Sequence, residues 1–168
     1  MDNNEMYKFI EDNKFKYLNF LESVYDFPFV CYDSSKILYF YLKNKFNCDI
    51  KLVHGIFDSY NHYWIETKNN NKTIIIDFVK FQFDNDFVGL SVEEIISRLD
   101  KNYPYVDEDN HDFQLYEATP NNFIDYYQHY EKDNINLNRH ENFDTFLSSS
   151  EDFLKKIYKH KDCYDGNL

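Results

Sequence analysis

With 168 residues, the chain has a length typical of one domain that is large enough to bury a core. Its formal net charge of −12 argues against binding to DNA or RNA through phosphates, because that requires clustered Lys and Arg side chains. No window approaches the ~18 uncharged apolar residues of a membrane-spanning helix, so no membrane partner is expected.

The thiols and the N-terminus indicate the compartment. The three cysteines, Cys31, Cys48 and Cys163, cannot all pair within one chain. The residues after Met1 are polar or acidic rather than apolar, which predicts that no signal peptide is present. The simplest interpretation is a cytoplasmic protein with reduced thiols.

Two helices are predicted in the first quarter of the chain. Residues 4–25 place apolar side chains near a 3.6-residue period, which predicts an amphipathic helix. Residues 30–44 contain neither Gly nor Pro, and from Ile37 to Leu42 they are apolar on every side. Helices of that kind are normally buried on most faces, so this segment is predicted to be the central helix, with Cys31 in its first turn.

The periodicity then changes to two, which predicts three strands. The first begins at Ile50 and reaches Gly55, the second covers residues 60–67 and the third covers residues 73–79. An Asn-rich turn over residues 68–72 joins the second strand to the third.

Helical and loop signals alternate in the second half of the chain. Ser91, with Glu94 three residues later, predicts a capping box that opens a short helix over residues 91–100. The remaining expectations are an acidic loop over 107–112, a strand over 113–117, a helix from Thr119-Pro120 to about residue 130, and a last helix over 141–160. We expect one α+β domain over residues 1–160 and a flexible tail over 161–168.

Three residues in these elements have the chemistry of a cysteine nucleophile site. Cys31 opens a helix, His62 lies on the second strand and Asp77 lies on the third. Acyl chemistry by a cysteine needs a thiolate, a base that creates it and an anion that orients the base. The first turn of a helix has unpaired N–H groups and a positive dipole end, which stabilise a thiolate and can hold an oxyanion. The alternative interpretation is a small buried cysteine with an unrelated surface histidine.

The register of the second hairpin can be tested by arithmetic, because paired residue numbers in an antiparallel hairpin have a constant sum. A two-residue turn at Asn69-Asn70, or a four-residue turn over residues 68–71, places His62 directly opposite Asp77 and Trp64 opposite Ile75. Glu66 lies on the same face but two pairs further from His62, so Asp77 is the preferred carboxylate.

Four segments in this order resemble the transglutaminase-like (papain-related) superfamily. They are Cys31-Tyr-Asp-Ser-Ser, Leu52-Val-His-Gly, His62-Tyr-Trp-Ile-Glu and Ile76-Asp77. The resemblance covers about residues 28–83, a third of the chain. It implies a transglutaminase-like fold, in which a central helix packs on an antiparallel sheet with additional C-terminal helices. It also implies that the ring of Trp64 walls the site and excludes water.

The resemblance implies a cysteine peptidase or amidase that acts on a peptide, amide or thioester substrate through a thioester acyl-enzyme. No metal or organic cofactor is expected. The superfamily also contains transglutaminases and arylamine acetyltransferases, so acyl transfer to an amine on the same triad is an alternative. A further alternative is a binding module that has kept the fold and lost activity.

The second oxyanion donor departs from the pattern of papain relatives, which place a Gln a few residues before the cysteine. Residues 25–30 contain neither Gln nor Asn. Asn19, Tyr25 and Gln82 are the candidate donors.

Overall fold

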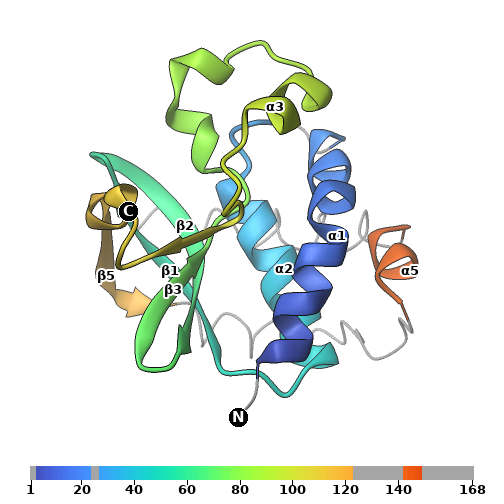
Figure 1. The fold of residues 1–168 in the computed structure, drawn as a ribbon, viewed down its shortest axis with the longest axis vertical. Coiled ribbons are helices and arrows are strands. Elements are labelled where there is room, and N and C mark those ends of the chain that lie inside the picture. Colours follow the sequence, from blue (N-terminus) through green and yellow to red (C-terminus); the bar gives the residue numbers. More distant parts are fainter. Residues whose placement is uncertain (1–2, 24–26, 123–141, 149–168) are drawn as a thin grey trace.

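The computed structural model describes residues 3–23, 27–122 and 142–148. Within them the fold is α+β, with four α-helices and one five-stranded antiparallel sheet (Figure 1). In chain order, the elements are α1 (Asn4–Glu22), α2 (Cys31–Lys45), β1 (Ile50–Phe57), β2 (Tyr60–Asn69), β3 (Lys72–Ile76), the 3-10 helices η1 (Lys80–Phe83) and η2 (Asn85–Phe87), α3 (Val92–Arg98), β4 (Tyr105–Asp107), the 3-10 helix η3 (His111–Leu115), β5 (Tyr116–Asn122) and α5 (Phe143–Ser148).

The prediction of a buried central helix is confirmed. Residues 32–42 of α2 are all buried, and α2 packs against β1 and β2. The sheet side chains that face the helices alternate along the strands, and Tyr63, Ile65 and Ile76 join the main core with α1 and α2. Figure 1 shows α1 and α2 together on one side of the sheet. The opposite face carries a smaller cluster built on Val53 and Trp64.

The sheet has the strand order β4-β3-β2-β1-β5. Its two hairpins turn on pairs of residues in the left-handed region, Asp58-Ser59 and Asn70-Asn71. Two-residue turns with positive φ at both positions match the right-handed twist of the flanking strands, and Asn and Asp tolerate that conformation.

The predicted register of the second hairpin is wrong, because the turn lies one residue later in the sequence than predicted. The turn falls at Asn70-Asn71 instead of Asn69-Asn70, so Ile75 pairs with Glu66 and not with Trp64. Pairing therefore shifts by two residues, and a shift of two returns every side chain to its original face. For that reason the predicted faces survive although the predicted partners do not.

The short helix that begins after Ser91 is confirmed, since the Ser91 side chain accepts a hydrogen bond from the backbone N–H of Glu94. The helix predicted to start at Thr119-Pro120 is wrong, because both residues lie in β5, which pairs with the free edge of β1. Long-range strand pairing here outweighs a local helix-start signal.

The other predictions for the second half are confirmed in part. The strand predicted over 113–117 starts only at Tyr116, after the 3-10 helix η3. Within the predicted last helix, α5 is helical, and Phe143 of α5 packs on the rings of Phe9 and Tyr41. The rest of that helix and the tail lie outside the described residues. No helix in the described ranges has the length and apolar character needed to cross a membrane.

Lys36 of α2 is fully buried near Asp33, and burial lowers the pKa of Lys36 from 10.5 to about 5, opposed only in part by the Asp33 charge. Between these two values the unfolded chain binds more protons at Lys36 than the folded chain, so this group makes stability rise with pH. We expect Lys36→Met to raise the free energy of unfolding at neutral pH by about 3 kcal/mol. The increase of that free energy with pH should also become smaller.

Urea unfolding across neutral and mildly alkaline pH measures both effects. Lys51→Met is the matched control, because Lys51 is exposed and its loss should change little. A Lys36→Met protein that is less stable at every pH would instead identify Lys36 as a charged partner of Asp33.

Candidate active site

Cys31 is the first residue of α2. The residue before it, Val30, gives the helix no side-chain cap, and the backbone N–H of Ser34 is bonded to the Val30 carbonyl at 2.8 Å. The N–H groups of the first turn have no partner inside a helix, so the helix brings donors and a positive dipole end to the thiol. Cys31 is a partly exposed free thiol, whereas Cys48 is buried.

His62 is fully buried on β2, where it is bonded to Asp77. Its Nε2 lies 2.6 Å from Oδ2 of Asp77. The imidazole is packed among aromatic rings, with the centroid of Phe83 at 4.9 Å, Phe57 at 5.7 Å and Trp64 at 5.9 Å. These rings keep water away from the pair, which strengthens the electrostatic interaction inside it.

The environment of His62 favours its protonated form. Burial by itself lowers the pKa of His62, but the charge and hydrogen bond of Asp77 outweigh it, and Cys31 adds to the effect, so the pKa is raised. The other ring nitrogen, Nδ1, is buried and forms no well-directed hydrogen bond to the described residues. His62 is thus fixed by Asp77 at one nitrogen, while the second remains available for a proton from the neighbouring thiol.

Asp77 follows the last residue of β3, and its backbone N–H and both of its carboxylate oxygens form hydrogen bonds. Its backbone N–H donates to the carbonyl of Pro104 at 2.9 Å, and its Oδ1 accepts the backbone N–H of Val79 at 3.1 Å. Its Oδ2 accepts both His62 and the hydroxyl of Tyr116, the latter at 2.6 Å. Burial raises the pKa of Asp77, but His62, Tyr116 and Val79 together more than reverse this, so the pKa is lowered and the carboxylate stays ionised.

Trp64 and Gly55 lie next to His62 on the sheet. Gly55 pairs with His62 across β1 and β2, and the Trp64 ring and the β5 backbone lie where a Gly55 side chain would stand. Trp64 is fully buried, and its Nε1 donates to Oε1 of Glu66 at 3.1 Å. Asp77 therefore contacts His62, as predicted, whereas Glu66 accepts a hydrogen bond from Trp64.

The three candidate oxyanion donors have different outcomes. Asn19 is exposed, and its amide donates to the Phe15 carbonyl in its own helix, so the structure does not bring it to Cys31. Tyr25 lies outside the described residues. Gln82 is buried in η1, and its Oε1 meets no hydrogen-bond partner among the described residues.

The two residues that flank Gln82 in η1 pack against other parts of the chain. Phe81 packs against Phe27, which precedes the nucleophile in sequence, with ring centroids 6.2 Å apart. Phe83 packs against His62. The segment that carries Gln82 therefore packs against His62 and against the chain shortly before Cys31.

Tyr116 is a residue of the candidate site that the sequence interpretation missed. It lies 39 residues after Asp77, at the start of a strand on the far side of β1. The only signal was its place in a predicted strand, because nothing local shows that a phenol will reach a carboxylate across the sheet.

Among the described residues, no group of three or more His, Cys, Asp or Glu side chains is arranged to hold a metal ion. The chain matches no protein-family model, no curated protein and no solved structure. The chemical interpretation therefore depends on the geometry of the site itself.

Proposed function

We propose that the protein is a cysteine-dependent acyl-transfer enzyme, with the activity of a peptidase or amidase, and that Cys31, His62 and Asp77 are its catalytic residues. The observation that carries the proposal is the buried 2.6 Å contact between His62 Nε2 and Asp77, together with the interaction of His62 with the thiol of Cys31 at the start of α2. Buried groups with perturbed pKa values and a specific partner are typical of catalytic sites. A fold of the transglutaminase-like kind is part of the proposal.

The proposed reaction proceeds in two halves. His62 takes the Cys31 proton, the thiolate attacks the carbonyl carbon of the substrate, and the imidazolium then protonates the leaving amine as the C–N bond breaks. Water loses a proton to His62 and attacks the resulting thioester, which releases the acid and restores the thiol. Asp77 remains ionised throughout and stabilises the imidazolium, while Tyr116 donates its hydroxyl to the same carboxylate oxygen, Oδ2.

The developing oxyanion needs two donors in this scheme. The backbone N–H of Cys31 is the natural first donor, because it belongs to the open first turn of α2. Gln82 is the proposed second donor, through its amide Nε2, because it is buried in η1, whose last residue, Phe83, packs against His62. Substrate peptides, amides or thioesters would approach from the partly exposed side of Cys31 in a reducing, cytoplasmic setting.

Two alternatives remain as outcomes of experiments. Acyl transfer to an amine uses the same residues, and analysis of products with and without an added amine distinguishes it from hydrolysis. An inactive binding module would keep the fold without a reactive thiol, and thiol chemistry distinguishes it from both enzymes.

Limiting iodoacetamide near neutral pH is expected to alkylate Cys31 before Cys48 or Cys163. Because a base such as His62 can take the thiol proton during the reaction, Cys31 should react about tenfold faster or more than a thiol without such a partner. Burial raises the pKa of Cys48 and also restricts access to it. Mass spectrometry of partly labelled protein measures the order.

The matched variant is His62→Gln, which should remove most of the advantage of Cys31 at neutral pH while the order at high pH changes less. Labelling of Cys163 first, with Cys31 inert at pH 7, would contradict the nucleophile assignment. The inactive binding module would then be the better description.

A further inference from the structure

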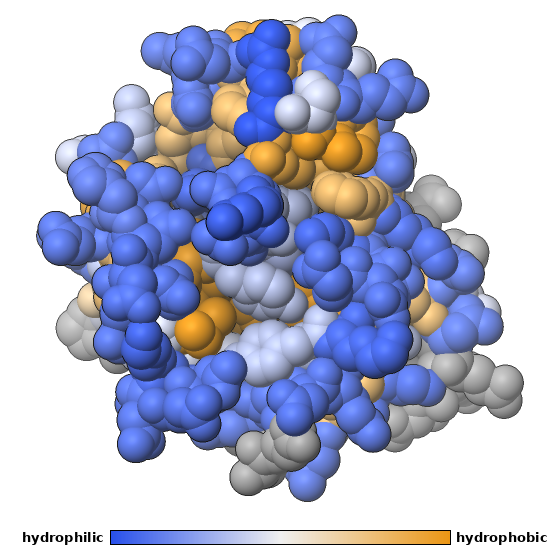
Figure 2. Space-filling model, in the orientation of Figure 1, coloured by the Kyte–Doolittle hydropathy of each residue, from blue (hydrophilic) through white to orange (hydrophobic). Residues whose placement is uncertain are grey.

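A pocket of about 680 Å³ borders the site, and the reaction proposed above makes no use of its interior. Asp77 contributes to its wall, but neither Cys31 nor His62 lines it. It is formed by the turn after β1, the segment from η1 to η2, the end of α3 and the chain around β4 and η3. Figure 2 shows a hollow on this face of the molecule, in which apolar surface is surrounded by hydrophilic side chains. The volume suits a small molecule or one long side chain.

The walls of the pocket are aromatic. Six rings line it, from Phe57, Phe81, Phe83, Phe87, Tyr103 and Tyr105. Phe81 and Phe87 are stacked with centroids 5.5 Å apart, and Phe57 and Phe83 are stacked at 5.5 Å. Ring stacks of this kind give a preformed wall, and ring faces attract organic cations as well as apolar groups.

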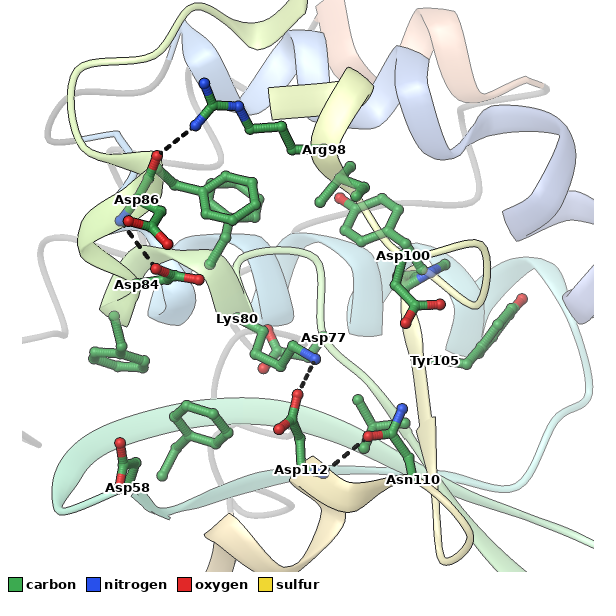
Figure 3. Close-up of a pocket in the computed structure, with 18 of the residues that line it drawn as sticks. Asp58, Asp77, Lys80, Asp84, Asp86, Arg98, Asp100, Tyr105, Asn110 and Asp112 are labelled. Atoms are coloured by element: carbon green, nitrogen blue, oxygen red, sulfur yellow. Dashed lines mark hydrogen bonds and ion pairs between the residues drawn. The ribbon is translucent and has the colours of Figure 1, made fainter. Parts of the chain in front are cut away.

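The rim of the pocket is acidic. Six aspartates line it, against two basic residues, Lys80 and Arg98. Lys80 is paired with Asp112 at 2.7 Å, and the Arg98 guanidinium donates to the backbone carbonyl of Asp86 at 2.9 Å (Figure 3). Besides Asp77 and Asp112, which have partners, the other four aspartates form no ion pair with any described residue: Asp58, Asp84, Asp86 and Asp100.

The carboxylates that form no ion pair surround the cavity instead of forming one cluster. Figure 3 shows Asp84 and Asp86 on one side of the pocket and Asp100 on the other, with the Lys80–Asp112 pair between them. Carboxylates on opposite walls of a cleft concentrate negative potential in the space between them.

We propose that this pocket binds an organic cation, in which a primary ammonium or guanidinium group is attached to an apolar or aromatic body. The carboxylates complement the charge, and the aromatic walls complement the body. A hydrated metal ion fits poorly, because the walls offer it rings and the described residues hold no cluster of ligands. The proposal does not depend on acyl transfer at Cys31, since occupancy can be measured without turnover.

Binding can be measured by titrating phenethylamine, spermidine and N-acetyl-arginine amide into the full-length protein and following backbone amide shifts. Phenethyl alcohol is the matched uncharged probe, because a hydroxyl replaces the ammonium. We expect saturable shifts at residues of η1, η2 and α3 with the cations. We expect phenethyl alcohol to bind at least about fivefold more weakly than phenethylamine. Phenethylamine and spermidine separate an aromatic from a linear occupant, and the arginine amide represents a peptide side chain.

The double variant Asp84→Asn/Asp100→Asn tests the charge. Asparagine can still accept the backbone hydrogen bonds that these side chains accept from Asp86 and Asn102. Each substitution is expected to weaken cation binding by up to about fivefold. The control is Asp12→Asn/Glu5→Gln on exposed positions of α1, which changes the net charge equally and should leave affinity unchanged.

Loss of cation binding in the pocket double variant alone supports the proposal, whether or not Cys31 proves reactive. Equal binding of phenethylamine and phenethyl alcohol would overturn it, as would equal weakening by both double variants. Absence of saturable shifts with all three cations would also overturn it.

Discussion

Replacing Asp77 with asparagine is expected to lower kcat/KM for amide or thioester cleavage by about 10³- to 10⁴-fold. The variant keeps one acceptor oxygen, which can serve Val79 or Tyr116 but not both, and it loses the anion that orients His62 and stabilises its protonated form. The raised pKa of His62 should fall with it, since the Asp77 charge and hydrogen bond are what overcome the effect of burial. Steady-state kinetics and the pH dependence of Cys31 alkylation measure the two effects.

Glu66→Gln is the matched control for this experiment. Glu66 lies on the same face of β2, but its carboxylate accepts from the Trp64 indole and does not contact His62. We expect a change of less than about threefold in kcat/KM, and both variants should show the circular dichroism of the parent. Equal losses at the two positions would mean that Glu66 also acts on His62.

Gly55→Ala is expected to cost about 4 kcal/mol of stability. The new Cβ would overlap the carbonyl oxygen of Glu117 and the ring of Trp64, and would lie 2.9 Å from Cα of Ala118. The backbone of β5 and a fully buried indole cannot both move away cheaply, so the strand pairing or the support under His62 must be lost.

Gly89→Ala is the control, because nothing lies within 4 Å of the added methyl group and only the φ of 75° opposes it. We expect a cost of about 1 kcal/mol there. Urea unfolding compares the two variants. If Gly55→Ala cost no more than Gly89→Ala, close contact between β1, β5 and Trp64 would not be essential to the fold.

The parts of the fold that could be predicted are those whose signals are local. An apolar run without Gly or Pro identified α2 and placed Cys31 at its start, and Ser91 with Glu94 marked the start of α3. Alternation with a period of two assigned His62 and Asp77 to one face, which holds for any even shift of register. That parity explains why the pair forms in the structure although the predicted turn was displaced.

The parts that could not be predicted depend on distant segments. Three consecutive asparagines, Asn69 to Asn71, can each occupy a left-handed turn position, so composition alone does not choose the turn. Thr119-Pro120 is equally suited to start a helix or to continue a strand, and the open edge of β1 decides between them. The acidic pocket likewise assembles from segments that share no motif.

The hydrogen bond from Tyr116 to Asp77 has a consequence for the order of events during synthesis. When the ribosome has made the three reacting residues, 39 residues separate Asp77 from its phenol partner, and β1 still has an open edge. Only the arrival of β5 closes that edge and completes the set of donors around the carboxylate. A nascent or truncated chain that ends before Tyr116 therefore carries a cysteine, a histidine and an aspartate in place but with the anion less firmly held. If the proposed function holds, full reactivity of the thiol would be delayed until most of the chain has been made.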